Sequence, residues 1–351
     1  MFLQNYLFAF LASLIASFIF TKAVIALCRR FSLFDHPRRH KRHKVPVPTL
    51  GGTAILIAFW VGIIIYLFLD TEAFPNIKTS LPNILIGSLI IYGVGLADDL
   101  RPVSAWVKLA AQVTAGLVLY FGGLSINLLS LPILGTTALN GLSVVITVFW
   151  VIALSNAINL IDGLDGLAAG VSVIAAGAMM VVGIIYMIDA VVLFSLALEG
   201  ALLAFWLFNR YPAKVFLGDC GSLLIGYIFA VISLVVPIKS FTTAALFMPL
   251  VVLGVPLTET VSSFLRRLAA GKNVMKADRR HIFHYLAYAG LSQRQIVYLF
   301  YLSGLFFGLI SIGMLLFNRM LVLSLLLLFM VVIFVIYFIF MARMKKGRLA
   351  K

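Results

Sequence analysis

The sequence predicts an all-α, polytopic membrane protein with about eleven transmembrane helices, the N-terminus outside and the C-terminus in the cytosol. Hydrophobic residues make up 63% of the chain and charged residues only 11%, whereas soluble domains are about half apolar and a quarter charged. Eleven stretches are apolar enough to cross a bilayer, which takes about 20 residues each. The cations gather in the loops of one side. These observations exclude an ordinary soluble domain, a disordered chain and a disulfide-built scaffold.

Ten of the eleven spans are runs without Asp, Glu, Lys or Arg. The first run, 1–21, is too long for a signal-peptide core and no small-residue cleavage site follows it. The uncharged run 109–161 is too long for one helix, and its glycine-rich and turn-rich piece 122–141 divides it into two spans. The run 190–209 is a span interrupted by Glu199. The remaining spans are 50–69, 79–97, 166–188, 220–238, 240–258, 295–318 and 320–342.

The charge distribution gives the orientation. The chain has 27 Lys and Arg against 12 Asp and Glu, a net charge of +15. With eleven spans, 23 of the basic residues fall on one side and 3 on the other, and the remaining one, Lys22, lies near the basic end of the first span. This asymmetry assigns the basic side to the cytosol. Topology and anions bound at that face then explain the high pI, and nucleic acid is not expected as a partner. We expect a single integral membrane domain, 1–351, whose cytosolic active-site loops are 28–49, 98–108, 159–166, 209–222 and 266–294.

Five aspartates lie at span ends in three of these loops, where acids at membrane depth are costly and usually functional. Asp98 and Asp99 occur in GLADDLRP. Adjacent residues of a helix point about 100° apart, so one carboxylate could face a metal while the other faces a substrate. A solvated helix end paired with Arg101 is the alternative interpretation.

The loop NAINLIDGLDGLAAG contains Asn156, Asn159, Asp162 and Asp165. The two aspartates are three residues apart and share a face if the segment is helical. The glycine after each aspartate allows backbone to approach a ligand closely. A bare turn between two spans needs none of these polar groups, so we interpret the loop as a binding site.

The third loop, FNRYPAKVFLGDCGS, places Asp219 between two glycines, with Asn209 and Lys214 upstream. A carboxylate beside small residues and a lysine suits a magnesium–phosphate site. Two basic segments complete the face, 29–52 and 266–286, although positive-inside bias alone could explain both. Zinc is not expected, because the second segment offers only two histidines at one-turn spacing and no cysteine lies nearby.

At these loops the sequence resembles the polyprenyl-phosphate N-acetylhexosamine-1-phosphate transferases, glycosyltransferase family 4. The matching stretches are PVPTLGG, LADD, KLAAQ, NAINLIDGLDGLAAG, PAKVFLGDCGS and DRRHIFHYL, scattered over most of the chain. The last stretch is more similar to the WecA/TagO-like branch, whose pattern is His-x-His-His, than to the MraY-like branch with its run of three histidines. This chain has His281 and His284, and it departs from the pattern at the middle histidine, where Phe283 stands.

The resemblance implies transfer of N-acetylglucosamine-1-phosphate from UDP-GlcNAc to undecaprenyl phosphate, with release of UMP. It places the reaction at the cytosolic face of a bacterial cytoplasmic (inner) membrane, as the first membrane step of an envelope polysaccharide such as O-antigen or teichoic acid. It implies a Mg2+ cofactor, with Mn2+ as a substitute. The implied catalytic and metal-binding residues are Asp98, Asp99 and Asp219, and the implied substrate-binding residues are Lys44, Lys108, Asn156, Asn159, Asp162, Asp165, Asn209, Lys214, Arg279, Arg280, His281 and His284.

Physical chemistry agrees with this picture. Two anionic reactants need cations at their phosphates, and a site at span ends can receive a lipid from the bilayer and a nucleotide from the cytosol. The alternatives are a UDP-muramoyl-pentapeptide or another UDP-HexNAc as donor, an ion-coupled transporter, and a purely structural membrane protein. A transporter usually has midplane binding groups and internal repeats, which the sequence does not show. The sequence fixes neither the sugar nor the oligomeric state, and it leaves a homodimer open.

Overall fold

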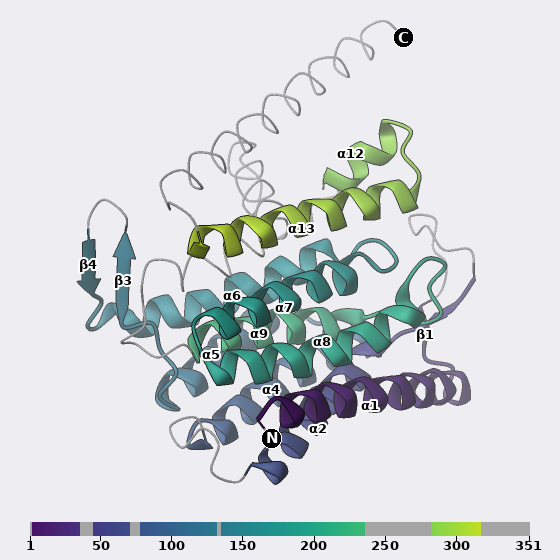
Figure 1. Ribbon diagram of the computed structural model, residues 1–351. Coiled ribbons are helices and arrows are strands. Elements are labelled where there is room, and N and C mark those ends of the chain that lie inside the picture. The colour runs from purple at the N-terminus through teal and green to yellow at the C-terminus, as the bar shows by residue number, and fades with distance from the viewer. Residues whose placement is uncertain (1, 36–44, 71–77, 132–134, 236–281, 317–351) are drawn as a thin grey trace, which may run out of the picture.

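The computed structural model describes residues 2–35, 45–70, 78–131, 135–235 and 282–316. Within these ranges the chain forms a bundle of long helices with two small β-ribbons (Figure 1). The helices are α1 (Phe2–Arg30), α2 (Gly51–Leu69), α4 (Leu81–Leu100), α5 (Ala105–Phe121), α6 (Leu142–Ile161), α7 (Leu167–Ile185), α8 (Asp189–Asn209), α9 (Gly218–Leu234), α12 (Ile282–Tyr288) and α13 (Gln293–Leu316), and the strands are β1 (Phe34–Asp35), β2 (Val47–Pro48), β3 (Leu128–Leu131) and β4 (Gly135–Ala138).

The helical membrane architecture is confirmed. Nine of the eleven predicted spans coincide with a long helix, and the other two, 240–258 and 320–342, lie outside the described residues. Among the described residues, seven helices are long and apolar enough to cross a membrane. The two shorter ones, α5 and α9, have 17 residues each, about 25 Å of helix against a hydrocarbon core of about 30 Å. The total number of spans and their orientation stay predictions.

Helix α9 is the centre of the bundle. Every residue from Cys220 to Leu234 is buried, as expected for a helix that is apolar all round. Helices α2, α4 and α6 pack against it, α1 packs on α2 and α8, and α7 lies between α8 and α13. Figure 1 shows α13 lying across the teal helices, with α12 at one of its ends. The core therefore forms around the helix whose first turn holds Asp219.

Glycines let the neighbouring helices approach α9 at backbone distance. A Cβ atom on Gly52 would lie 2.3 Å from the backbone nitrogen of Gly221, and one on Gly95 would lie 2.5 Å from the Cα atom of Cys220. On the opposite side, a Cβ atom on Gly226 would lie 2.3 Å from the carbonyl oxygen of Leu154. Small residues are the usual means of close helix packing in membranes.

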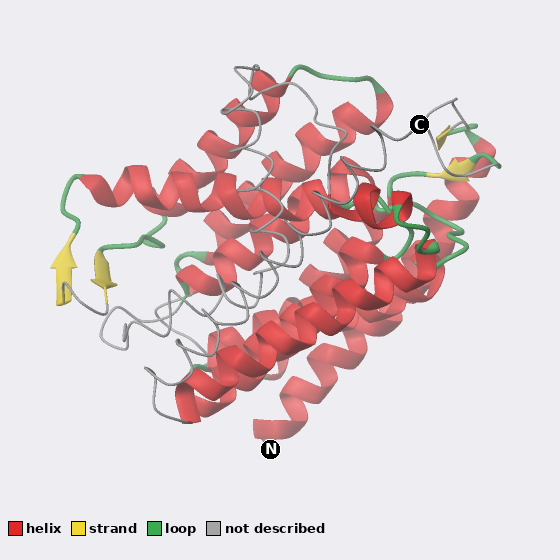
Figure 2. Ribbon diagram, turned by 90° about the horizontal axis from the view of Figure 1, so that it is seen from above, coloured by secondary structure: helices red, strands yellow, loops and turns green. Residues whose placement is uncertain are grey.

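The two β-ribbons are additions to the predicted all-α fold. Strands β1 and β2 pair antiparallel with Phe34 opposite Pro48. Strands β3 and β4 form a hairpin, with Leu128 opposite Ala138, inside the turn-rich piece that divides the long uncharged run. Figure 2 shows the two ribbons at opposite ends of the bundle. The sequence predicts that successive loops lie alternately on the two faces of the membrane. The positions of the two ribbons, at opposite ends of the bundle, are consistent with this prediction.

The polar loops are shorter than the predicted ranges, because several of their functional residues belong to helix ends. Helix α4 continues to Leu100 and α5 begins at Ala105, so only four residues connect them. Ser104 caps α5 by accepting a hydrogen bond from the backbone N–H of Val107, 3.4 Å away. Helix α6 likewise continues to Ile161, and α9 begins at Gly218. Helix ends leave free backbone N–H and C=O groups beside these side chains.

Candidate active site

Lys108 brings two of the predicted carboxylates together. Its Nζ atom lies 2.7 Å from Oδ2 of Asp98 and 2.5 Å from Oδ2 of Asp219. The three residues come from the last turn of α4, the first turn of α5 and the first turn of α9. Each side chain keeps between 19% and 28% of its exposure, so the cluster is still open to a ligand. A lysine between two carboxylates, at the end of a membrane bundle, is the centre of the candidate site.

Asp99 points away from this cluster. Its carboxylate accepts hydrogen bonds from the backbone N–H groups of Asp219, 2.8 Å away, and Cys220, 3.0 Å away. It therefore caps the N-terminus of α9, where a negative charge also meets the positive end of the helix dipole. Gly218 has a φ of +75°, and a Cβ atom there would lie 2.5 Å from Asp99. The two adjacent aspartates therefore have different partners, while the division of metal and substrate between them stays a prediction.

The two asparagines of α6 line the same side. Asn159 donates through Nδ2 to Oδ1 of Asp219, at 3.1 Å, and to the hydroxyl of Ser222, at 2.9 Å. Asn156 donates to Oε1 of Gln112, at 2.9 Å. Gln112 lies on α5, one helical turn after Lys108. Gln112 is 1% exposed and was missed as a site residue. Its spacing of four residues from Lys108 is the signal that would have found it.

Asp162 follows the last residue of α6 and has other carboxylates near it. Burial raises the pKa of this carboxyl well above its usual range, and the charges of neighbouring acids, Asp219 first, raise it further. No hydrogen bond to its side chain is present within the described residues. A ligand that brings positive charge would relieve this crowding of negative charge.

Asp165 and Asn209 hold loops together. Asp165 accepts a hydrogen bond from the backbone N–H of Ala213, 3.0 Å away. Asn209 accepts from the backbone N–H of Gly166 at 3.1 Å and donates to the carbonyl of Val215 at 2.9 Å. Asn209 is 3% exposed and joins these two loops, and its predicted contact with phosphates or sugar stays a prediction.

The other predicted residues are placed less fully. Lys214 is exposed and makes no ion pair in the described part of the chain. Lys44, Arg279, Arg280 and His281 lie outside the described residues, as does the side chain of His284. Phe283, which replaces a histidine of the resembled pattern, is 4% exposed. A Cβ atom on Gly163 would lie 2.5 Å from its ring, so the C-terminal part of the chain reaches the loop that holds Asp162.

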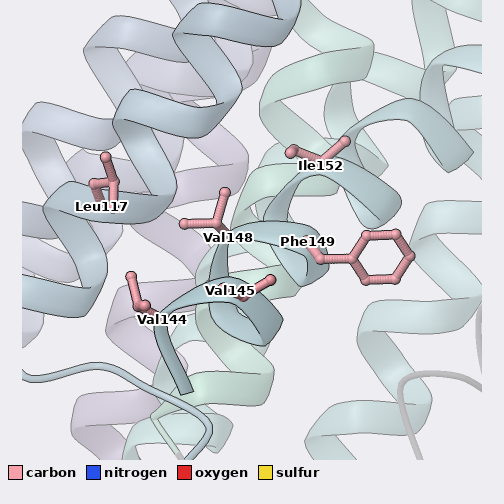
Figure 3. Close-up of a pocket in the computed structure, with 6 residues that line it drawn as sticks. All are labelled: Leu117, Val144, Val145, Val148, Phe149 and Ile152. Atoms are coloured by element: carbon pink, nitrogen blue, oxygen red, sulfur yellow. The ribbon is translucent and has the colours of Figure 1, made fainter. Parts of the chain in front are cut away.

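An apolar groove runs between α5 and α6 (Figure 3). Its volume is about 330 Å³, which lies in the range of small-ligand sites. One end of the groove, at Ile152, is one helical turn from Asn156, which donates to the Ile152 carbonyl at 2.8 Å. The other end lies at Val144 and Val145, in the first turn of α6. Its lining is entirely hydrocarbon: Leu117, Val144, Val145, Val148, Phe149 and Ile152.

A helical membrane protein with a lysine–carboxylate site at one end of the bundle and an apolar groove between two of its helices is suited to chemistry on a polar group carried by a lipid. Residues 81–237 match the model of the family described as glycosyl transferase family 4. A probable undecaprenyl-phosphate N-acetylglucosaminyl 1-phosphate transferase of Bacillus subtilis (strain 168) is 34% identical over 305 residues, which cover 87% of this chain and 83% of the relative. The chain belongs to this family.

Further relatives carry related names. A decaprenyl-phosphate N-acetylglucosaminephosphotransferase of Mycobacterium leprae (strain TN) is 32% identical over 86% of this chain and 81% of the relative. A phospho-N-acetylmuramoyl-pentapeptide-transferase of Lactobacillus helveticus (strain DPC 4571) is 31% identical over 77% of this chain and 84% of the relative. Together they support a multi-pass membrane transferase that moves an N-acetylhexosamine-1-phosphate to a polyprenyl phosphate.

Proposed function

We propose that this chain transfers N-acetylglucosamine-1-phosphate from UDP-GlcNAc to undecaprenyl phosphate, forming undecaprenyl-diphospho-GlcNAc and UMP. The observation that carries the proposal is the convergence of Asp98, Lys108 and Asp219 at one end of the bundle, from which α5 and α6 extend to form the walls of the apolar groove. The groove offers an apolar surface for the isoprenoid tail of the acceptor. The polar cluster offers a cation for the phosphates.

The reaction is a displacement at phosphorus. An oxygen of the acceptor phosphate attacks the phosphorus atom that carries the sugar, and the bond from that phosphorus to the oxygen bridging the two phosphates of the donor breaks. UMP leaves with the electron pair. The acceptor phosphate is already largely anionic, so no residue has to remove a proton from it. Lys108 would hold positive charge against the phosphate oxygens, whose charge is what such catalysis has to stabilise.

Asp219 and Asp98 would hold the magnesium ion. Magnesium prefers one or two carboxylates together with waters and substrate phosphates, and these two carboxylates share a single lysine. The described residues contain no group of three metal-binding side chains, so waters and the substrates would complete the coordination. When bound, the ion neutralises charge on the diphosphate as UMP departs.

The C-terminal motif and the relatives support N-acetylglucosamine as the sugar of the donor. This chain has Phe283 between His281 and His284 and lacks a run of three histidines. The two relatives described first have N-acetylglucosamine in their names, at 34% and 32% identity. The relative named for an N-acetylmuramoyl-pentapeptide makes that donor the second candidate. The reaction takes place at the cytosolic face of the bacterial inner membrane, where the basic loops lie by the positive-inside rule.

The test is UMP release by the purified full-length chain with undecaprenyl phosphate, with and without magnesium. We expect turnover with UDP-GlcNAc that requires the metal. Faster turnover with UDP-muramoyl-pentapeptide would replace the proposed donor. Absence of UMP release with every UDP-sugar, together with uptake of solutes into proteoliposomes, would replace the transferase by a transporter.

A further inference from the structure

Two aromatic side chains of the α12–α13 hairpin rest on the glycines of the α6–α7 loop, residues 162–166. Phe283 of α12 lies against Gly163, as its burial and its distance from a Cβ atom at that position show. Tyr301 of α13 lies against the first turn of α7, where a Cβ atom on Gly170 would lie 2.2 Å from its hydroxyl oxygen. The space left by the missing side chains of Gly163 and Gly170 is therefore filled by Phe283 and Tyr301.

The hydroxyl of Tyr301 joins three helices. It donates a hydrogen bond to the carbonyl oxygen of Gly166, 2.6 Å away, and accepts one from Nε1 of Trp206 in α8, 2.8 Å away. Gly166 has a φ of +77°, which favours glycine, and it begins α7. Its N–H is bonded to Asn209. Both polar groups of this one residue are therefore held by side chains from other helices.

The loop held in this way carries Asp162 and Asp165. Asp165 precedes Gly166 directly, and Asp162 precedes Gly163, so each aspartate adjoins a glycine that has a fixed partner. A loop with fixed ends keeps its functional side chains in a narrow range of positions, which is what a second layer of supporting residues supplies to a binding site.

We propose that Tyr301 and Phe283 are positioning residues for the donor nucleotide-sugar, through which the α12–α13 hairpin fixes the α6–α7 loop in its binding conformation. The inference rests on the proposed function, since it takes this loop as part of the donor site. Neither aromatic touches the reacting atoms. Loss of the hydroxyl leaves the Trp206 N–H without its partner and leaves the Gly166 carbonyl only the bond from the backbone N–H of Gly170, 2.9 Å away. The loop then loses its link to α13 and shifts.

The test is steady-state UMP release by the full-length chain, with each substrate varied while the other is saturating. Tyr301→Phe keeps the ring and removes only the hydroxyl. We expect the KM for UDP-GlcNAc to rise about tenfold, the effect of a partly buried hydrogen bond lost with one partner left unsatisfied, and the KM for undecaprenyl phosphate to change less than about twofold. Trp206→Phe should give a smaller rise, because Tyr301 still donates to Gly166.

Tyr298→Phe is the matched control, since Tyr298 lies one turn away on the same helix and is 62% exposed; we expect no change. Phe283→Leu tests the second contact without hydrogen bonds and should also raise the donor KM selectively. An unchanged donor KM in Tyr301→Phe would overturn the inference. So would an equal rise in both KM values with a lowered unfolding temperature, which marks a general structural role. A wild-type chain without UMP release would refute the proposed function instead.

Discussion

At the scale of single residues, hydrogen-bond partners separate side chains that look equivalent in the sequence. Asp98 and Asp99 are neighbours, yet one binds Lys108 and the other caps α9. The sequence predicted that they diverge, because that follows from helix geometry. It could not predict which faces which way, since the answer depends on the backbone of residues 219 and 220, more than a hundred positions away. The partners of Asn209, Gly166 and Val215, could not be predicted for the same reason, since they belong to other loops.

Asp219→Asn keeps the shape of the side chain and removes its charge from Lys108. We expect a folded protein whose UMP release falls by roughly a hundredfold, as for loss of a preorganised electrostatic contact, with a higher magnesium requirement for the remainder. Asp99→Asn is the comparison variant. It should lose about 0.5–2 kcal/mol of unfolding free energy, the range for a helix cap, and some activity, with an unchanged magnesium titration. Near-normal turnover of Asp219→Asn would remove the metal role from this residue.

Asp162 gives a prediction about pH. Its pKa is raised in the folded protein by burial and by neighbouring carboxylates, so the folded state binds a proton more tightly than the unfolded state does. This group therefore favours folding below the unfolded pKa of about 4, and the contribution is lost as pH rises from there through the folded pKa. Asp162→Asn should raise the unfolding temperature at pH 8 and leave it nearly unchanged at pH 4. An equal shift at both pH values would contradict the effect of charge.

At the scale of elements, the length of the apolar runs predicted the helices. Composition alone could not predict the β3–β4 hairpin or the central position of α9. Each described span was visible as an uncharged run, except 190–209 with its single Glu199, because a bilayer demands about 20 apolar residues. The hairpin of β3 and β4 was missed, since its segment contains the turn formers of an ordinary loop. The central position of α9 was also hidden: all the spans are apolar, and only the glycines around α9 distinguish the helix that others approach most closely.

Two glycines of α4 give a matched test of this packing. A Cβ atom on Gly95 would collide with the backbone of Cys220 at 2.5 Å, whereas one on Gly93 would meet nothing within 4 Å. Gly95→Ala should destabilise the protein by about 1–3 kcal/mol and, by displacing the first turn of α9, also reduce UMP release. Gly93→Ala should be neutral or slightly stabilising, because alanine favours helix. Thermal unfolding of both variants measures the difference. Similar values would show that α4 and α9 do not pack at backbone distance.

At the scale of the whole molecule, the site residues come from helices spread along the chain and meet at one end of the bundle. The connections after α4 and α6 and the one before α9 lie at this end, while β3 and β4 lie at the other (Figure 2). The fold brings together five predicted site residues: Asp98, Lys108, Asn156, Asn159 and Asp219. Their meeting at one end was already implied by the predicted spans, which place all their loops on the same membrane face. Which membrane face this end occupies rests on the charge asymmetry, 23 basic residues against 3.

Single cysteines at the two ends test the orientation. The natural cysteines, Cys28 and Cys220, are free and buried, so they should give little background with a membrane-impermeant thiol reagent. Arg101, in the turn between α4 and α5, and Thr137, in β4, are both exposed. We expect Thr137→Cys to react in intact cells and Arg101→Cys to react only after the inner face is opened, because positive-inside bias places the site in the cytosol. The reverse pattern would put the Lys108 site on the outer face, where UDP-sugars made in the cytosol could not reach it.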